Sequence, residues 1–110
     1  MKKVMVYYTL AEDPNQTFEV SPYGITYVFT LKRIRGFMYV TIEDSLGNRI
    51  SGPLRVCNAA WLIPHTAYNN EGGGNFLILN QNNEYPDFKN FETSCQLRYY
   101  TAEEIESLVA

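Results

Sequence analysis

The sequence of 110 residues has few of the side chains that bind transition metals, because it contains only one histidine and two cysteines. Neither Cys57 nor Cys95 belongs to a C-x-x-C pair, so nothing indicates a zinc ribbon or a thioredoxin-type site. Together with His65 they offer three soft ligands, at spacings unlike those of a structural zinc site. We therefore predict no metal and no cofactor.

Long apolar runs are also missing. Stretches such as Ile25–Leu31 and Phe76–Leu79 are much shorter than the roughly 20 residues that a helix needs to span a bilayer. The apolar stretch after Met1–Lys3 ends by Leu10 and meets acidic residues, so we recognise no export signal. We expect no membrane partner, and free thiols rather than a disulfide.

Basic residues are too few for a typical nucleic-acid-binding protein. Nine Lys and Arg stand against twelve Asp and Glu, which gives a net charge of −3, whereas non-specific binding depends on replacing phosphate counterions with basic side chains. One cluster, Lys32, Arg33 and Arg35 beside Tyr27 and Phe37, has the mixture of basic and aromatic residues that can bind a single strand. The plainer interpretation is a solvated strand end, and we expect no nucleic-acid partner.

Aromatic residues are abundant instead. Nine Tyr, six Phe and one Trp accompany ten Asn and only six Ala. Aromatic side chains suit a pleated, half-buried surface and Asn suits turns, so the composition predicts an all-β protein. With 45% apolar and 19% charged residues, we expect residues 1–110 to form one β-rich globular domain.

The apolar pattern predicts a series of short strands. In the clearest one, Ile25, Tyr27, Phe29 and Leu31 point to one side. We predict a small antiparallel sheet or barrel-like domain of about six to eight short strands, the early ones forming a meander. The predicted strands are Lys3–Thr9, Thr17–Val20, Ile25–Arg33, Phe37–Ile42, Arg49–Val56, Asn75–Asn80 and Ser94–Tyr100.

Two local signals refine this outline. Pro53 lacks the N–H that a central strand would use, so the Arg49–Val56 strand should slip, bulge or lie at an edge. Thr101 and Glu104 have the spacing of a capping box, which predicts one short C-terminal helix at about residues 102–109.

The motifs of common nucleophilic enzymes are absent. No G-x-S-x-G motif accompanies His65, and Pro64 beside it indicates a structural turn. A dyad of Cys57 with His65 is conceivable in space and leaves a thiol hydrolase as an alternative, although no local feature favours a lowered thiol pKa. We predict no catalytic residues and no enzymatic activity.

Acidic pairs and glycine-rich segments give no stronger signal. Glu43-Asp44, or Glu84 with Asp87, could supply paired carboxylates, but acids in turns are usually solvated. Gly72–Gly74 lacks the Lys-Ser/Thr of a phosphate-binding loop. The simpler interpretation is a flexible hairpin connection.

The aromatic side chains exceed what a small core must hold. Tyr and Trp are enriched in protein interfaces because they bury a large area and keep a polar tip. Tyr7 and Tyr8 belong to this surplus. As candidate partner-interface residues we select Trp61, Tyr68, Tyr99 and Tyr100.

The order of the segments resembles the small phage baseplate plug family of cyanophage-type contractile tails and prophages. The likeness extends from Pro14 to Leu108, includes a Gly-rich turn before Asn75, and rests on order and spacing rather than on one diagnostic motif. One departure is Asn80-Gln81, where the family leads us to expect an acidic residue. The matching segments are Pro14–Val20, Gly24–Leu31, Phe37–Ile42, Leu46–Asn48, Ile50–Val56, Leu62–Pro64, Asn75–Leu79 and Leu97–Glu104.

The resemblance implies a non-enzymatic virion component. Such a protein would plug or stabilise the distal channel of the tail tube and hub through contacts with tail hub, tube or spike proteins. The resemblance leaves open whether the protein forms a homo-oligomer. We expect the protein in the tail baseplate and, during assembly, in the host cytoplasm. The alternative from another class is a stand-alone β-barrel that binds single-stranded nucleic acid or glycan.

Overall fold

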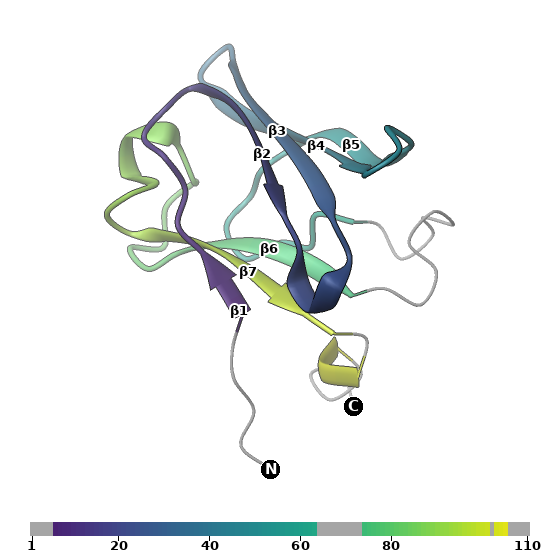
Figure 1. Ribbon diagram of the computed structural model, residues 1–110. Coiled ribbons are helices and arrows are strands. Elements are labelled where there is room, and N and C mark those ends of the chain that lie inside the picture. The colour runs from purple at the N-terminus through teal and green to yellow at the C-terminus, as the bar shows by residue number, and fades with distance from the viewer. Residues whose placement is uncertain (1–5, 64–73, 102, 106–110) are drawn as a thin grey trace.

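The computed structural model describes residues 6–63, 74–101 and 103–105, which form two antiparallel sheets that pack face to face (Figure 1). Two short 3₁₀ turns, η1 (Pro22–Gly24) and η3 (Phe88–Asn90), lie in the connections. The strands are β1 (Val6–Tyr8), β2 (Asn15–Val20), β3 (Tyr27–Ile34), β4 (Phe37–Asp44), β5 (Arg49–Arg55), β6 (Asn75–Asn80) and β7 (Cys95–Tyr100).

The four-stranded sheet follows the chain in the order β2-β3-β4-β5, which confirms the predicted meander. The second sheet has the order β1-β7-β6, so the first strand lies beside the last one. The all-β prediction is confirmed, but the strands described here form no closed barrel. One reason is the edge strand β5, where Pro53 cannot donate a ladder hydrogen bond.

The core lies between the sheets and follows the alternation of β3. Tyr27, Phe29 and Leu31 are buried, as predicted, and the rings of Tyr27 and Phe29 meet the ring of Phe76 on β6. The ring of Phe29 lies edge-on to the ring of Phe76, with 4.8 Å between the centroids. Ile25, predicted to share this inward row, is 48% exposed because β3 begins only after η1, at Tyr27.

The predicted irregularity in β5 is confirmed. The pairing with β4 shifts register between Val40 and Ile42, and β5 is an edge strand. Gly52, which precedes Pro53 through a cis peptide bond, has a φ of +94°. A Cβ at this position would overlap the carbonyl oxygen of Val40 and would lie 2.9 Å from the Cα of Thr41. The backbone of β4 therefore leaves room only for glycine.

The end of the chain begins a helix as predicted. The N–H of Thr101 donates to Glu104 Oε1 at 3.0 Å, and the N–H of Glu104 donates to Thr101 Oγ1 at 3.2 Å. These two bonds are the predicted capping box. Residues 103–105 are helical, whereas the other residues of the predicted helix lie outside the described part. Among the described residues, no helix is long and apolar enough to cross a membrane.

Both cysteines are free thiols, as predicted, and they differ in exposure. Cys57 is half-buried, whereas Cys95 is buried and its Sγ–H donates to Asn90 Oδ1 at 3.2 Å. Burial raises the pKa of the Cys95 thiol to about 11; a hydrogen bond with Ser94 acts in the opposite direction and the charge of Asp87 in the same direction. Cys95 is therefore an inert core residue near neutral pH.

The first prediction concerns Gly52. We expect Gly52→Ala to lower the free energy of unfolding by roughly 2–4 kcal/mol, since the new Cβ both collides with β4 and disfavours the positive φ. Gly47→Ala is the matched control, because Gly47 has a φ of +87° with nothing within 4 Å of its Cβ position. It should cost roughly 1–2 kcal/mol. Urea denaturation measures both, and equal losses would contradict the tight approach to β4.

The second prediction concerns the thiols. In the folded chain at pH 8, iodoacetamide should modify Cys57 and leave Cys95 unmodified, because a thiol with a pKa near 11 has only about one thiolate in a thousand at that pH. In denaturant both should react. Peptide mass spectrometry identifies the modified residue, and rapid native alkylation of Cys95 would show that the core around β7 is not closed.

Candidate interaction surfaces

Two of the four acidic side chains that the sequence offered for catalysis, Asp44 and Asp87, have structural partners. Asp44 closes the hairpin between β4 and β5: its Oδ1 accepts from the N–H groups of Leu46 and Asn48 at 2.9 and 2.8 Å. The hydrogen bonds from Asn48 lower the pKa of this carboxyl below its ordinary value. Asp87 pairs with Arg33, with 3.1 Å between Oδ1 and Nε. The described residues also contain no cluster of three metal ligands, and His65 lies outside them.

Two of the predicted interface residues lie side by side. The rings of Trp61 and Tyr100 meet edge to face, with 5.5 Å between centroids and an interplanar angle of 89°. Trp61 pairs with Leu77 of β6 in an isolated β-bridge and is 36% exposed. Both rings therefore lie on the outer face of the three-stranded sheet.

Asparagine side chains hold Trp61 in this place. Asn75 of β6 accepts from the N–H of Ile63 at 2.9 Å and donates to its carbonyl oxygen at 2.7 Å. On the other side of Trp61, Asn58 Oδ1 accepts from the N–H of Asn80 at 2.7 Å. The segment between these bonds runs along the edge of β6, and its backbone N–H groups at Ala59 and Leu62 donate to that strand.

The outer face of the sheet β1-β7-β6 gathers further interface-type side chains. Arg98 lies on the central strand, directly between Tyr7 of β1 and Leu77 of β6. Its Nε and Nη2 both donate to Gln96 Oε1 on the same strand, at 3.1 and 3.0 Å, which fixes the guanidinium along β7. Tyr7 is 55% exposed. We call this surface the aromatic face; it consists of Tyr7, Trp61, Leu77, Leu79, Arg98 and Tyr100.

The other two predicted interface residues are not on this face. Tyr99 is 4% exposed, packs against Phe76 with 4.9 Å between ring centroids, and accepts a hydrogen bond from the N–H of Gly74 at 3.1 Å. It follows the inward alternation of β7, opposite to Tyr100. Tyr68 lies outside the described residues.

Sequence analysis did not select Leu77 and Leu79 as surface residues. Phe76 and Ile78 point inward on the same strand, so the run is apolar on both faces. A short apolar run without alternation is the signal that both faces of β6 have apolar surroundings.

The position where we expected an acidic residue lies at the end of β6, where Asn80 is buried and Gln81 begins an exposed turn. Asn80 is buried, and its Oδ1 accepts from the N–H of Asn82 at 2.9 Å. Its Nδ2 is buried without a hydrogen-bond partner among the described residues. The neutral amide thus shapes the turn after β6 and presents no charge at the surface.

The predicted basic cluster is dispersed by the alternation of β3. Lys32 is exposed on the outer face of the four-stranded sheet, whereas Arg33 pairs with Asp87 in the loop before η3. Arg35 lies in the turn to β4 with a φ of 50°, and Tyr27 is buried in the core. The five residues therefore form no common surface for a nucleic-acid strand.

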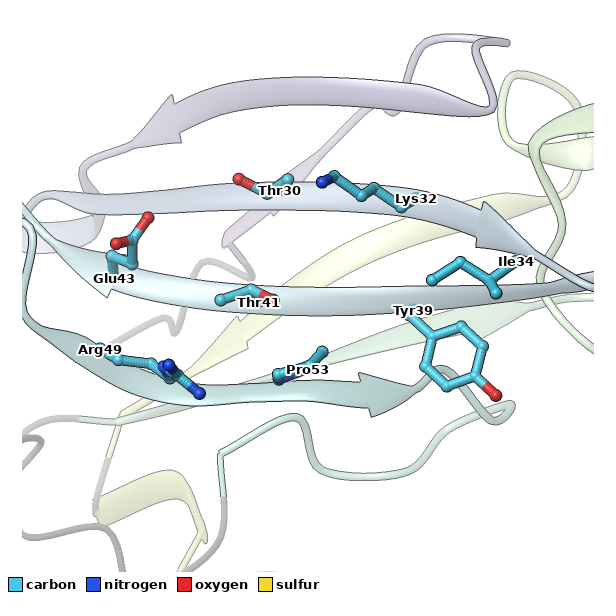
Figure 2. Close-up of a pocket in the computed structure, with 8 residues that line it drawn as sticks. All are labelled: Thr30, Lys32, Ile34, Tyr39, Thr41, Glu43, Arg49 and Pro53. Carbon is cyan, nitrogen blue, oxygen red and sulfur yellow. The ribbon is translucent and has the colours of Figure 1, made fainter.

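A groove occupies the outer face of the four-stranded sheet. Its volume is about 410 Å³, and its side chains project from three neighbouring strands (Figure 2). The lining residues are Thr30, Lys32 and Ile34 from β3, Tyr39, Thr41 and Glu43 from β4, and Arg49 and Pro53 from β5.

An arginine between two rings lies beside this groove. The guanidinium carbon of Arg55 is 3.6 Å from the ring centroid of Phe37 and 4.7 Å from that of Tyr85. The two rings also meet each other edge to face, with 6.2 Å between centroids. Arg55 Nε is buried without a hydrogen-bond partner among the described residues, so the ring contacts hold this side chain.

Comparison with known proteins identifies the family. A model of the protein family described as "Cyanophage baseplate Pam3 plug gp18" matches residues 5–103 of the chain. No curated protein matches the chain. The matched segment includes all seven strands of the described residues and both outer faces. The chain therefore belongs to the cyanophage baseplate plug family, which confirms the resemblance found in the sequence and indicates a structural role in a phage tail baseplate.

Proposed function

We propose that this protein closes or stabilises the distal channel of the tail tube and hub until contraction, as a structural subunit without catalytic activity. The observation that supports this proposal best is the family match over residues 5–103. The structural use of Asp44 and Asp87, and the inert thiol of Cys95, agree with a role that needs no chemistry.

We further propose that the aromatic face binds a neighbouring tail hub, tube or spike protein. Tyr, Trp and Arg are the residue types that dominate binding energy at protein interfaces, and Tyr7, Trp61, Arg98 and Tyr100 gather on one sheet face. Arg98 is already oriented by Gln96, so little side-chain freedom remains to be lost on binding.

The third prediction tests this face. Trp61→Ala and Tyr7→Ala should each reduce incorporation into tails, and a hot-spot residue lost from an interface typically costs 2 kcal/mol or more, which is roughly thirtyfold in affinity. The measurement is complementation of a phage that lacks the gene, with the plug protein quantified in purified tails. Leu46→Ala is the control, since Leu46 is 85% exposed on the β4–β5 turn, away from this face.

Thermal unfolding separates an interface role from a structural one. Tyr7→Ala removes an exposed ring and should leave the melting temperature nearly unchanged. Normal incorporation of both variants, with only a lower melting temperature for Trp61→Ala, would show that Trp61 stabilises the fold and would contradict the proposed interface.

The fourth prediction concerns position in the virion. Electron cryo-microscopy of wild-type tails should show density for this protein on the axis of the tube at its distal end, and tails that lack the gene should show an open channel there. Density at the periphery of the baseplate, with a channel unchanged by the deletion, would refute the plugging role while leaving family membership intact.

A further inference from the structure

We propose that β2 is a dimerisation edge, at which the free protein pairs with β2 of a second copy of this chain to form one continuous sheet. β2 stands at the end of the order β2-β3-β4-β5, so only one of its two sides is bonded to a neighbouring strand. The aromatic face belongs to the other sheet. The proposal therefore does not rest on the role of that face or on the closing of the channel.

The outer side of β2 carries unused backbone hydrogen-bonding groups. The N–H of Arg33 donates to the carbonyl oxygen of Pro14 at 2.9 Å, which starts the ladder between β2 and β3. Because bonded pairs alternate along an antiparallel ladder, every second residue from Pro14 turns its groups toward β3, whereas Thr17 and Glu19 turn theirs away. Among the described residues, no other strand or side chain takes up these outward groups.

The other sheet edges are covered or interrupted. The segment around Trp61 donates backbone hydrogen bonds to β6, and Pro53 and the register shift interrupt β5. β1 offers only three described residues. By contrast, β2 pairs with β3 over six residues without a bulge, and it contains no proline. An unpaired edge of this kind is a template for another strand.

The sequence of β2 complements itself when two copies run antiparallel about Thr17. Thr17 then lies opposite Thr17 of the second copy, and Asn15 lies opposite Glu19. The two threonines would exchange both of their backbone hydrogen bonds, and each Glu19 N–H would donate to the carbonyl oxygen of Asn15 in the other copy. The N–H of Asn15 already donates to Asp13 Oδ1 at 3.0 Å, so it needs no acceptor from the second copy.

Unlike charges approach each other across this pairing. Glu19 and Lys32 are exposed, and neither forms an ion pair among the described residues. Lys32 is the register partner of Asn15, so one strand would separate Glu19 of one copy from Lys32 of the other, with about 10 Å between their Cα atoms. The two long side chains can meet over the shorter Asn15. A pairing centred on Glu19 would instead place two carboxylates opposite each other, which is unfavourable.

A row of threonines crosses the sheet and would continue into the second copy. Thr17 pairs with Thr30, and Thr30 pairs with Thr41. Thr30 and Thr41 lie on the outer face of the sheet (Figure 2), and Thr17 is exposed beside them. Cross-strand threonine pairs stabilise a sheet, and pairing about Thr17 places the rows of the two copies in line.

The geometry of this contact closes after two copies. Both copies would use the same edge, so the contact is isologous and leaves no further edge of this kind for growth. The two-fold axis would be normal to the sheet, which keeps both aromatic faces uncovered on the same side. One strand of six residues is much less than the roughly 20–30 residues that each partner contributes to a standard interface. We therefore expect a weak dimer that forms at high concentration.

The fifth prediction uses sedimentation equilibrium of the full chain. Its average mass should rise from that of one chain toward that of two between micromolar and millimolar concentration. Thr17→Pro should abolish this rise, because it removes an outward N–H, whereas Thr17→Val retains the N–H and should preserve the dimer. Proline is tolerated on an edge strand where the N–H faces solvent, so the melting temperature of Thr17→Pro should stay close to that of the wild type.

A charge exchange tests the contact without altering the backbone. Glu19→Lys and Lys32→Glu should each weaken the dimer, by about fivefold for each of the two symmetric contacts, and the double variant should restore it. Lys89→Glu is the matched control, since it makes the same charge reversal at an exposed residue of η3, away from β2, and should change the dissociation constant by less than twofold.

Three results would overturn the proposal: a chain that stays monomeric at millimolar concentration, a dimer that persists in folded Thr17→Pro, or a double charge variant that dimerises no better than the single ones. If Thr17→Pro does not fold, the charge exchange decides alone. Incorporation into tails tests the proposed function separately. A chain that remains monomeric but fills the tube axis would keep its role in the channel and lose only the pairing through β2.

Discussion

The ring of Phe76 is the contact on which the arrangement of this protein depends. It meets the rings of Tyr27, Phe29 and Tyr99 at centroid distances of 5.0, 4.8 and 4.9 Å, so one side chain of β6 connects the two sheets. Burial, and to a smaller extent Tyr99, raises the pKa of Tyr27 to about 12, so its hydroxyl keeps its proton throughout the neutral range. Because side chains alternate along a strand, placing Phe76 inward places Leu77 outward. The core contact thereby determines which residues form the aromatic face.

The two outer faces differ in polarity: the outward positions of β3 are largely polar, whereas those of β6 are apolar. Along β3, the threonine and lysine at positions 30 and 32 alternate with core residues, which gives the groove its polar lining. Along β6, Leu77 and Leu79 are apolar, and Trp61 covers part of this surface through its bridge to the strand. An apolar outer face on a small sheet is a liability in an isolated chain. In a subunit that is bound on that side, the same face supplies binding energy.

The sequence was sufficient where the signal was local, and insufficient where distant segments had to be brought together. The alternation of Tyr27, Phe29 and Leu31, the interruption at Pro53 and the capping box at Thr101 were all recognisable. The neighbourhood of Trp61 and Tyr100 was not, because it depends on the hydrogen bonds that Asn58 and Asn75 make across the chain. Asparagine is typical of turns, but these two side chains join separate segments. The groove was equally hidden, since its lining needs the register of three strands.

The two outer faces lie on opposite sides of a thin sandwich and differ chemically, so the two sides of this small protein are not equivalent. Stacked sheets lie about 10 Å apart, so partners on both sides would be separated by little more than the core. Apolar and aromatic contacts supply affinity, whereas arranged charges mainly specify orientation and exclude wrong partners. A subunit with identical faces could insert either way round. With the aromatic residues around Arg98 on one side and the polar groove around Lys32 on the other, a subunit bound on both sides would fit its neighbours in only one orientation. Binding on two sides would also stabilise the folded chain by mass action, so the short core between them need not be highly stable alone.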